Sequence, residues 1–182
     1  IRGSFPKEFL SLPREVLISA MREHQKYFSL VSASGELLPD FIAVSNTKAK
    51  DPTVVRRGNE RVLQARLSDA RFFFLEDQKV PLIQRLEGLK KVVYHSKLGT
   101  SYEKVMRICA LSDYLVDRLH LGNPEIVHRA ALLCKADLIT GMVGEFPSLQ
   151  GVMGRVYARL SGEAEEVAQA IYEHYLPTAA GG

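Results

Sequence analysis

The sequence predicts a mainly α-helical protein with a small α+β part at its beginning. Three observations lead to this prediction. β-prone runs beside turn residues occur in residues 1–80, apolar residues recur at helical spacing through residues 81–182, and the composition is that of an ordinary globular protein. The chain has 182 residues, of which 46% are hydrophobic and 25% charged, which suffices for a core. We expect an α+β segment over residues 1–80 and an all-helical domain over residues 81–182.

The α+β segment should begin with a helix and a hairpin. Pro13 suits the first turn of a helix over "REVLISAMREHQKYF". The apolar stripe of this helix would consist of Val16, Leu17, Ala20 and Met21. Two β-prone runs follow, Tyr27–Val31 and Phe41–Val44, and the Ser-Ala-Ser-Gly and Pro-Asp stretches between them predict a hairpin. The next stretch, "TKAKDPTVVRRG", is expected to be an exposed loop, because its charges and Pro52 break any period.

A basic helix is predicted from Asn59, whose side chain can cap a helix. Its apolar stripe would consist of Leu63, Leu67, Ala70 and Phe74. Arg57, Arg61 and Arg71 fall on another face of this helix, together with Gln64 and Ser68. We call these three residues the arginine row. The helix therefore separates an apolar face from a basic one.

The arginine row has two interpretations. It is either a solvated face with local pairs to Glu60 and Asp69, or a surface that contacts a phosphate backbone or an acidic partner. Two further basic residues, Arg56 and Lys50, favour the second. Residues 1–80 carry 13 Lys+Arg against 10 Asp+Glu, and residues 81–182 carry 11 against 11, so the whole formal excess of +3 lies in the first part.

The all-helical domain is predicted from a succession of helix start signals and apolar stripes. We expect all strands of the chain to lie before residue 81. Pro81 should open a helix with Leu82, Leu86, Leu89 and Val93 directed inward. Thr100 and Glu103 have the spacing of a capping box. The core stripe of the helix that they begin would be Val105, Ile108, Leu111, Leu115 and Leu119. Asn123 and Pro124 mark the next start. Two more helices are expected, one up to Ser161-Gly162 and one over "EAEEVAQAIYEHYL".

The stretch "HRAALLCKADLITGMVGEF" contains metal-ligand residue types at His128, Cys134, Asp137 and Glu145. On one helix, at about 100° per residue, His128 and Asp137 would point to opposite sides, so these residues cannot converge on one ion. Cys109 and Cys134 sit among apolar neighbours, which favours two buried thiols over a disulfide. No Gly-x-Ser-x-Gly sequence and no phosphate loop occur. We therefore expect no metal site in this stretch.

Around "VVYHSKLGTSYEKVMRICALSDYLV" and "VHRAALLCKADLI", the second part resembles the HD superfamily of helical metal-dependent phosphohydrolases. In this resemblance His95 stands for an early His, and the His-Asp pair of the family falls on Cys134 and Lys135. A lysine in place of a bridging carboxylate would repel cations. The resemblance therefore implies an HD-like helical bundle whose metal site is degenerate, and an HD-type phosphohydrolase remains the alternative function.

Longer stretches resemble the glycyl-tRNA synthetase beta-subunit family of bacteria: "MREHQKYFSLVSASGELLPDFIAVSN", "GNERVLQARLSDARFFFLEDQKVPL", "KADLITGMVGEFPSLQGVMGRVYA" and "GEAEEVAQAIYEHYLP". The resemblance implies a noncatalytic piece of a longer cytoplasmic subunit. Its partners would be tRNA(Gly), the rest of the beta subunit and an alpha subunit that uses ATP and Mg to activate glycine, with no membrane. RNA recognition often adds aromatic stacking. Tyr27, Phe28, Phe72, Phe73 and Phe74 are either stacking residues or core residues that join the hairpin to the helix.

Overall fold

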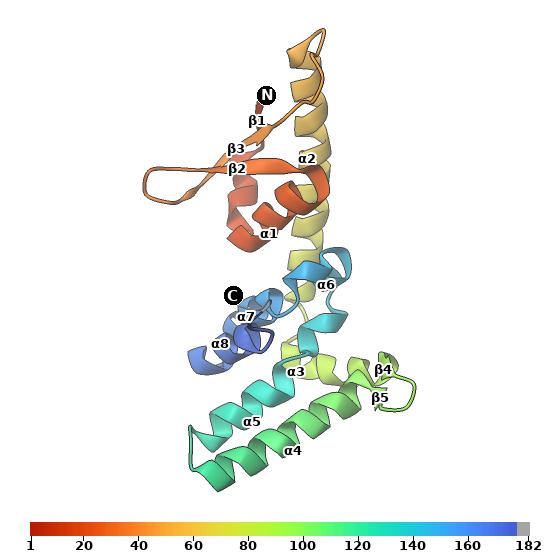
Figure 1. Ribbon diagram of the computed structural model, residues 1–182, viewed down its shortest axis with the longest axis vertical. Coiled ribbons are helices and arrows are strands. Elements are labelled where there is room, and N and C mark those ends of the chain that lie inside the picture. The colour runs from red at the N-terminus through yellow and green to blue at the C-terminus, as the bar shows by residue number, and fades with distance from the viewer. Residues whose placement is uncertain (178–182) are drawn as a thin grey trace. The chain divides into compact units, whose positions relative to one another are not determined.

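The computed structural model describes residues 1–177 (Figure 1). It is mainly α-helical with a small α+β part, as predicted. The chain forms two compact units, Ile1–Leu75 and Glu76–Gly182. The division into domains near residue 80 stays a prediction, because compactness alone does not show independent folding. No helix within the described residues is both long and apolar enough to cross a membrane.

The sheet of the first unit has three antiparallel strands in the order β1-β3-β2. They are β1 (Arg2–Ser4), β2 (Tyr27–Val31) and β3 (Leu37–Ala43). The predicted hairpin is confirmed, although its second strand begins at Leu37, before the expected Phe41. Gly35 has φ +84° in the connecting turn, a conformation that glycine adopts without strain. The strand β1 was not predicted, since three residues carry too little periodicity to be recognised.

Helices pack on this sheet and close the core of the first unit. A 3-10 turn, Lys7–Ser11, leads to α1 (Arg14–Ser19), which continues through a π-helical turn, Ala20–His24. The predicted stripe of this helix is confirmed. Its four residues are all almost inaccessible to solvent: Val16, Leu17, Ala20 and Met21. From the sheet, Phe41 is fully buried and stacks on Tyr27, with ring centroids 4.6 Å apart.

The basic helix α2 (Pro52–Asp77) begins seven residues before the predicted Asn59, so the expected loop over "DPTVVRRG" is wrong. Asp51 Oδ1 accepts a hydrogen bond from the Thr53 N–H at 2.8 Å, and Pro52 occupies the first turn. Proline is tolerated there because the first N–H groups of a helix have no partner inside it. Leu63, Leu67 and Ala70 are fully buried, which confirms the predicted stripe.

The second unit contains six α-helices in its described part, joined by short 3-10 turns (Figure 1). The helices are α3 (Leu82–Arg85), α4 (Ser101–Leu119), α5 (Pro124–Leu133), α6 (Gly141–Glu145), α7 (Val152–Leu160) and α8 (Glu165–Glu173). The 3-10 turns are Leu86–Lys91, Ala136–Ile139 and Pro147–Leu149. The closest packing joins α4 to α5, α7 to α8 and α5 to α8. These three contacts connect α4, α5, α8 and α7 in series.

The predicted starts of α4 and α5 are confirmed. Thr100 Oγ1 accepts the Glu103 N–H at 3.3 Å, and Glu103 Oε2 accepts the Thr100 N–H at 2.6 Å, which completes a capping box. Asn123 Oδ1 accepts the Glu125 N–H at 3.0 Å, with Pro124 at the first helical position. The last helix ends at Glu173, so Tyr175 lies beyond it and is 40% exposed instead of facing the core.

The expectation that strands occur only before residue 81 is wrong. The strands β4 (Val93–His95) and β5 (Gly99–Thr100) form a small antiparallel hairpin. Its turn is supported by His95 Nδ1, which accepts the Lys97 N–H at 3.1 Å, and by Gly99 at φ +84°. The predicted helix from Pro81 therefore stops before Val93, which is 74% exposed. Leu82, Leu86 and Leu89 are buried as predicted.

The buried carboxylate of Asp77 holds the second unit together. Its Oδ1 accepts the Gly141 N–H at 2.8 Å, and its Oδ2 accepts the Met142 N–H and the Tyr157 hydroxyl, both at 2.9 Å. Arg85 Nη2 lies 3.4 Å from Oδ1, and the two side chains are 12% and 6% exposed. Asp77 thus satisfies the first N–H groups of α6 from a position 64 residues away in the sequence.

Candidate nucleic-acid interface

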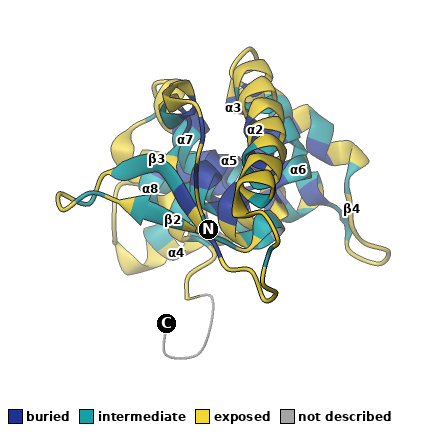
Figure 2. Ribbon diagram, turned by 90° about the horizontal axis from the view of Figure 1, so that it is seen from above, coloured by how far each residue is buried: buried dark blue, intermediate teal, exposed yellow. Residues whose placement is uncertain are grey.

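The structure places the arginine row on an exposed face of α2. Arg57, Arg61 and Arg71 are all exposed, while the buried residues of this helix lie on another side (Figure 2). Gln64 and Ser68, which share the face by helical spacing, are exposed as well. The sequence therefore predicted the phase of this helix correctly. The face has the form that a phosphate contact needs, with guanidinium groups one or more helical turns apart.

Of the four exposed arginines of α2, two have acidic neighbours and two do not. Arg71 Nη1 lies 3.4 Å from Glu8 Oε1, and Arg56 Nε lies 3.9 Å from Glu60 Oε1. These are surface pairs, which contribute little to stability and exchange readily. Arg57 and Arg61 form no ion pair with any residue in the range 1–177. They leave their charge available to an anion from outside this chain, as does the exposed Lys50 just before the helix.

The five aromatic candidates separate into two groups. Tyr27 is half-buried and stacks on Phe41, whereas Phe28 and Phe72 are 63% and 59% exposed. Phe73 and Phe74 are half-buried. Phe72 and Arg71 line a surface cavity of about 310 Å³ with four other residues, Glu8, Phe9, Ser68 and Leu75. An exposed aromatic ring beside a guanidinium is the combination on which an unpaired base stacks.

The residues matched to the HD pattern do not converge. His95 is exposed in β4, Cys134 is buried at the end of α5, and Lys135 is nearly buried. The helix that contains His128, α5, ends at Leu133, so Asp137 lies in a separate 3-10 turn. No group of three His, Cys, Asp or Glu side chains within residues 1–177 is arranged to hold a metal ion. The expected absence of a metal stays a prediction for elemental analysis.

Lys135 takes part in a contact that the sequence did not reveal. Its Nζ lies 2.7 Å from His174 Nε2 and 3.7 Å from the centre of the Tyr175 ring. Burial lowers the pKa of His174 to about 4, so the imidazole is neutral near pH 7. Its Nδ1–H then donates to the Ile171 carbonyl at 2.5 Å, and Nε2 accepts from the lysine. Lysine, histidine and tyrosine form a packed contact, not a site for cations.

Asp137 is a structural carboxylate. It is fully buried, and its Oδ2 accepts the N–H groups of Gly151 and Gly154 at 2.6 and 2.9 Å. Burial raises the pKa of Asp137 to about 6, although these two hydrogen bonds oppose the shift. Cys109 and Cys134 are free buried thiols, as predicted, and burial raises the pKa of Cys134 to about 11, which makes it a poor nucleophile.

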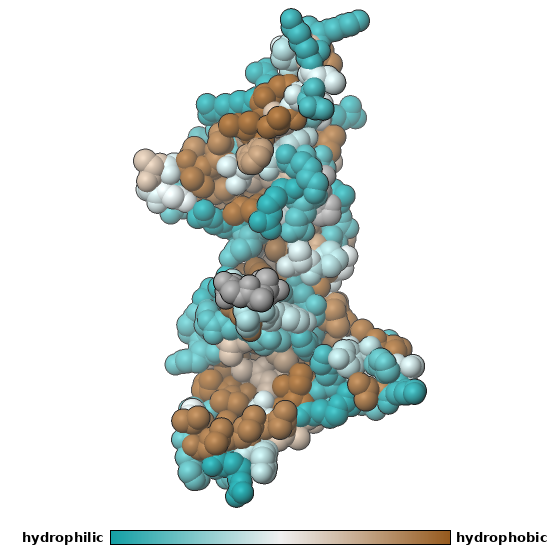
Figure 3. Space-filling model, in the orientation of Figure 1, coloured by the Kyte–Doolittle hydropathy of each residue, from teal (hydrophilic) through white to brown (hydrophobic). Residues whose placement is uncertain are grey.

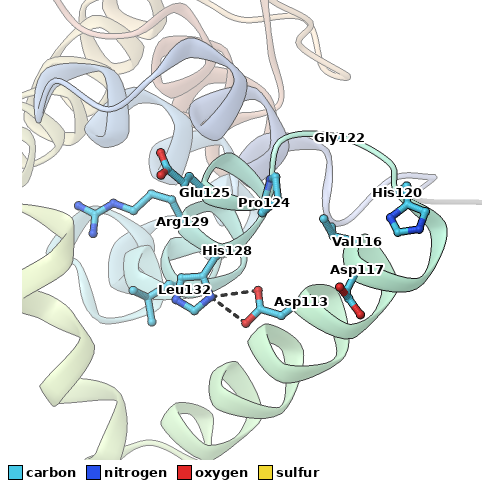
Figure 4. A pocket seen from close by; sticks show the side chains of 10 residues that line it. All are labelled: Asp113, Val116, Asp117, His120, Gly122, Pro124, Glu125, His128, Arg129 and Leu132. Carbon is cyan, nitrogen blue, oxygen red and sulfur yellow. Dashed lines mark hydrogen bonds and ion pairs between the residues drawn. The ribbon is translucent and has the colours of Figure 1, made fainter.

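A cavity of about 820 Å³ lies between α4 and α5 (Figure 4). Asp113 on α4 and His128 on α5 point toward each other, with His128 Nδ1 3.0 Å from Asp113 Oδ2. Arg129 donates two hydrogen bonds to the Glu163 carboxylate, from Nη2 at 2.6 Å and from Nε at 2.9 Å, so its charge is already neutralised. Asp117 and Glu125 add further carboxylates to the lining. The cavity would repel phosphate, which leaves α2 as the better candidate for an RNA contact.

Comparisons with known proteins agree with the resemblance. The family model described as "Glycyl-tRNA synthetase beta subunit" matches residues 1–182. The glycine–tRNA ligase beta subunit of Geotalea uraniireducens is 63% identical over 182 residues, which are 100% of this chain and 26% of that protein. The beta subunit of Geobacter metallireducens is 62% identical with the same coverage, and that of Syntrophus aciditrophicus is 59% identical over 180 residues.

The chain spans about a quarter of the length of these relatives. All three carry the name of one subunit of a ligase, and none is named as a phosphohydrolase. The family match runs from the first residue to the last, through both compact units. The chain therefore belongs to the glycyl-tRNA synthetase beta-subunit family.

Proposed function

We propose that this chain is a noncatalytic part of a glycine–tRNA ligase, where it contributes tRNA binding and architecture to the ATP-dependent charging of tRNA(Gly). The family match over all 182 residues is the observation on which the proposal rests. ATP, Mg and glycine would be used on the alpha subunit. The chain would work beside the rest of the beta subunit in the cytoplasm, where tRNA is charged.

The side chains of α2 support a phosphate contact on this part of the subunit. Arg57 and Arg61 are exposed, unpaired within the described residues and one helical turn apart. They can bind a phosphate at the lowest cost in free energy, because no ion pair must first be broken. Arg71 would exchange Glu8 for a phosphate, with Phe72 beside it. Arg56 and Lys50 would extend the basic surface toward the start of the helix.

The test uses the intact enzyme of alpha and beta subunits with Arg57, Arg61 and Arg71 changed to Gln. Each phosphate contact releases condensed counterions, so losing three should lower the slope of log affinity against log salt by about 2 to 3. The KM for tRNA should rise, while glycine-dependent exchange of ATP with pyrophosphate should not change. A matched control removes the same charge elsewhere, with Arg22, Lys79 and Lys97 changed to Gln, all three being exposed.

The two variants separate the specific effect from the general one. If the control weakens tRNA binding as much as the α2 variant, the effect comes from net charge alone. If neither variant changes the affinity or its salt slope, the arginine row is a solvated face. If the exchange of ATP with pyrophosphate falls with the α2 variant, these arginines support glycine activation, and a purely RNA-binding role is wrong.

A further inference from the structure

The helix α4 has an apolar face that its sequence marks as core and that the structure leaves exposed. Leu111, Leu115 and Leu119 are 60%, 44% and 57% exposed, although their spacing predicted a buried stripe. Ile108 is half-buried at the beginning of the same line. We call these four residues the α4 stripe. Their separations of 3, 4 and 4 residues keep them on one side of the helix, which is the pattern of a surface that packs against another helix.

The exposed stripe does not result from a wrong helical phase. Val105 and Cys109 are buried on a neighbouring face of the same helix, which packs against the rest of the second unit. The helix α4 thus has two apolar faces, and only one of them is covered by described residues. A helix that is apolar on two sides is expected to be buried between two neighbours.

The exposed apolar surface extends beyond the stripe. Leu121, in the connection after α4, is 65% exposed, and Tyr114 is 57% exposed. Figure 3 shows brown surface where Figure 1 draws α4 and α5. Single exposed leucines are ordinary, but a contiguous apolar patch with a polar border marks a contact with another protein surface. Leucine and isoleucine lack the flat rings and donors that RNA requires, so a protein is the expected occupant.

Length and charge indicate which protein segment covers the stripe. The relatives are nearly four times as long as this chain, so most of the subunit lies outside residues 1–182. Arg107 and Arg118 fall beside the line of the stripe by helical spacing, and both are exposed. Arg107 has no ion pair within residues 1–177, and Arg118 lies only over the Tyr114 ring, 5.9 Å from its centre. This border suits an acidic edge on the occupant.

We propose that the α4 stripe is the docking site of an amphipathic helix from the same subunit, outside residues 1–182. The docking helix presents an apolar face to Leu111, Leu115 and Leu119, and acidic side chains to Arg107 and Arg118. Such a contact completes the core of the second unit in the longer chain. The contact does not involve tRNA, so the proposal can be tested separately from the role of the arginine row.

The first test measures thiol labelling in the intact enzyme without tRNA. Leu115→Cys places a thiol in the stripe, and Ala110→Cys places the matched control on an exposed face of the same helix. Mass spectrometry of the labelled peptides gives the rate at each site. A docked helix should slow the labelling of the thiol at position 115 at least about tenfold relative to position 110, because labelling then requires local opening. Equal rates would overturn the proposal.

A photo-cross-linking amino acid at position 115 of the intact enzyme identifies the occupant. We expect a cross-link within the same beta polypeptide, to a segment outside residues 1–182 with an acidic and an apolar side. A cross-link to residues 1–75, to the alpha subunit or to a second beta copy would overturn the assignment. Beta chains carrying two isotope labels distinguish a link within one copy from a link between copies. The same group at position 110 should give no protein cross-link at this segment.

Discussion

Replacing Asp77 by Ala should strongly destabilise the second unit. The change leaves the N–H groups of Gly141 and Met142, the hydroxyl of Tyr157 and the nearly buried guanidinium of Arg85 without their shared acceptor. Removing one partner of a buried charged network costs about 3 to 5 kcal/mol, because the remaining polar groups stay desolvated. For a chain of this length the midpoint of thermal unfolding should fall by about 10 °C.

Urea unfolding followed by far-UV circular dichroism measures this loss of free energy. Tyr157→Phe is the matched control: it removes one donor and leaves the carboxylate with Gly141, Met142 and Arg85. It should cost about 1 kcal/mol. If Asp77→Ala costs no more than Tyr157→Phe, the carboxylate is not the centre of the network, and the physical account of how α6 begins is wrong.

Three further predictions concern pH, capping and metal. Because the pKa of Asp137 is raised to about 6, its contribution to stability is full below about pH 4 and is lost as the pH rises through 6. From pH 5 to pH 7 the parent should lose about 1 kcal/mol relative to Asp137→Asn in urea titrations, and parallel curves would contradict this. Thr100→Ala should cost about 1 kcal/mol by removing the cap of α4, and an unchanged urea midpoint would show that Glu103 suffices alone. Elemental analysis of the purified chain should find no stoichiometric transition metal; one that His95→Ala removes would restore the phosphohydrolase alternative.

Local signals predicted much of this fold. The capping box at Thr100 and the Asn123-Pro124 start depend on residues within three positions of each other, so the sequence contains the whole interaction. The prediction that α2 begins only at Asn59 is wrong, and the reason is again local. Pro52 interrupts the helical pattern of the sequence, although Asp51 in front of it provides a cap and the first turn of a helix accepts proline.

Contacts between residues far apart in the chain could not be predicted from the sequence. Asp77 meets Gly141 across 64 residues, and Lys135 meets His174 across 39, and no periodicity connects either pair. The residues of metal-ligand type also have partners that are distant in the sequence. His128 pairs with Asp113 from the facing helix, and Asp137 turns inward to the N–H groups before and within α7. The residue types alone could not distinguish a ligand from a satisfied structural carboxylate.

The disagreement at α4 has a different cause. Hydrophobic periodicity reflects the surroundings of a residue in the complete protein, whereas burial here reflects only the 182 residues present. On the covered face of α4 the two agree, since Val105 has no exposed surface, but in the α4 stripe Leu111 is 60% exposed. An exposed core-type stripe is therefore informative in a chain that spans a quarter of its relatives. Burying a leucine side chain fully is worth about 1.5 to 3 kcal/mol, so covering Leu111, Leu115 and Leu119 would be a substantial part of the stability of an ordinary domain. Contact with solvent does not explain a leucine at each turn of this face, and an apolar partner surface explains it directly.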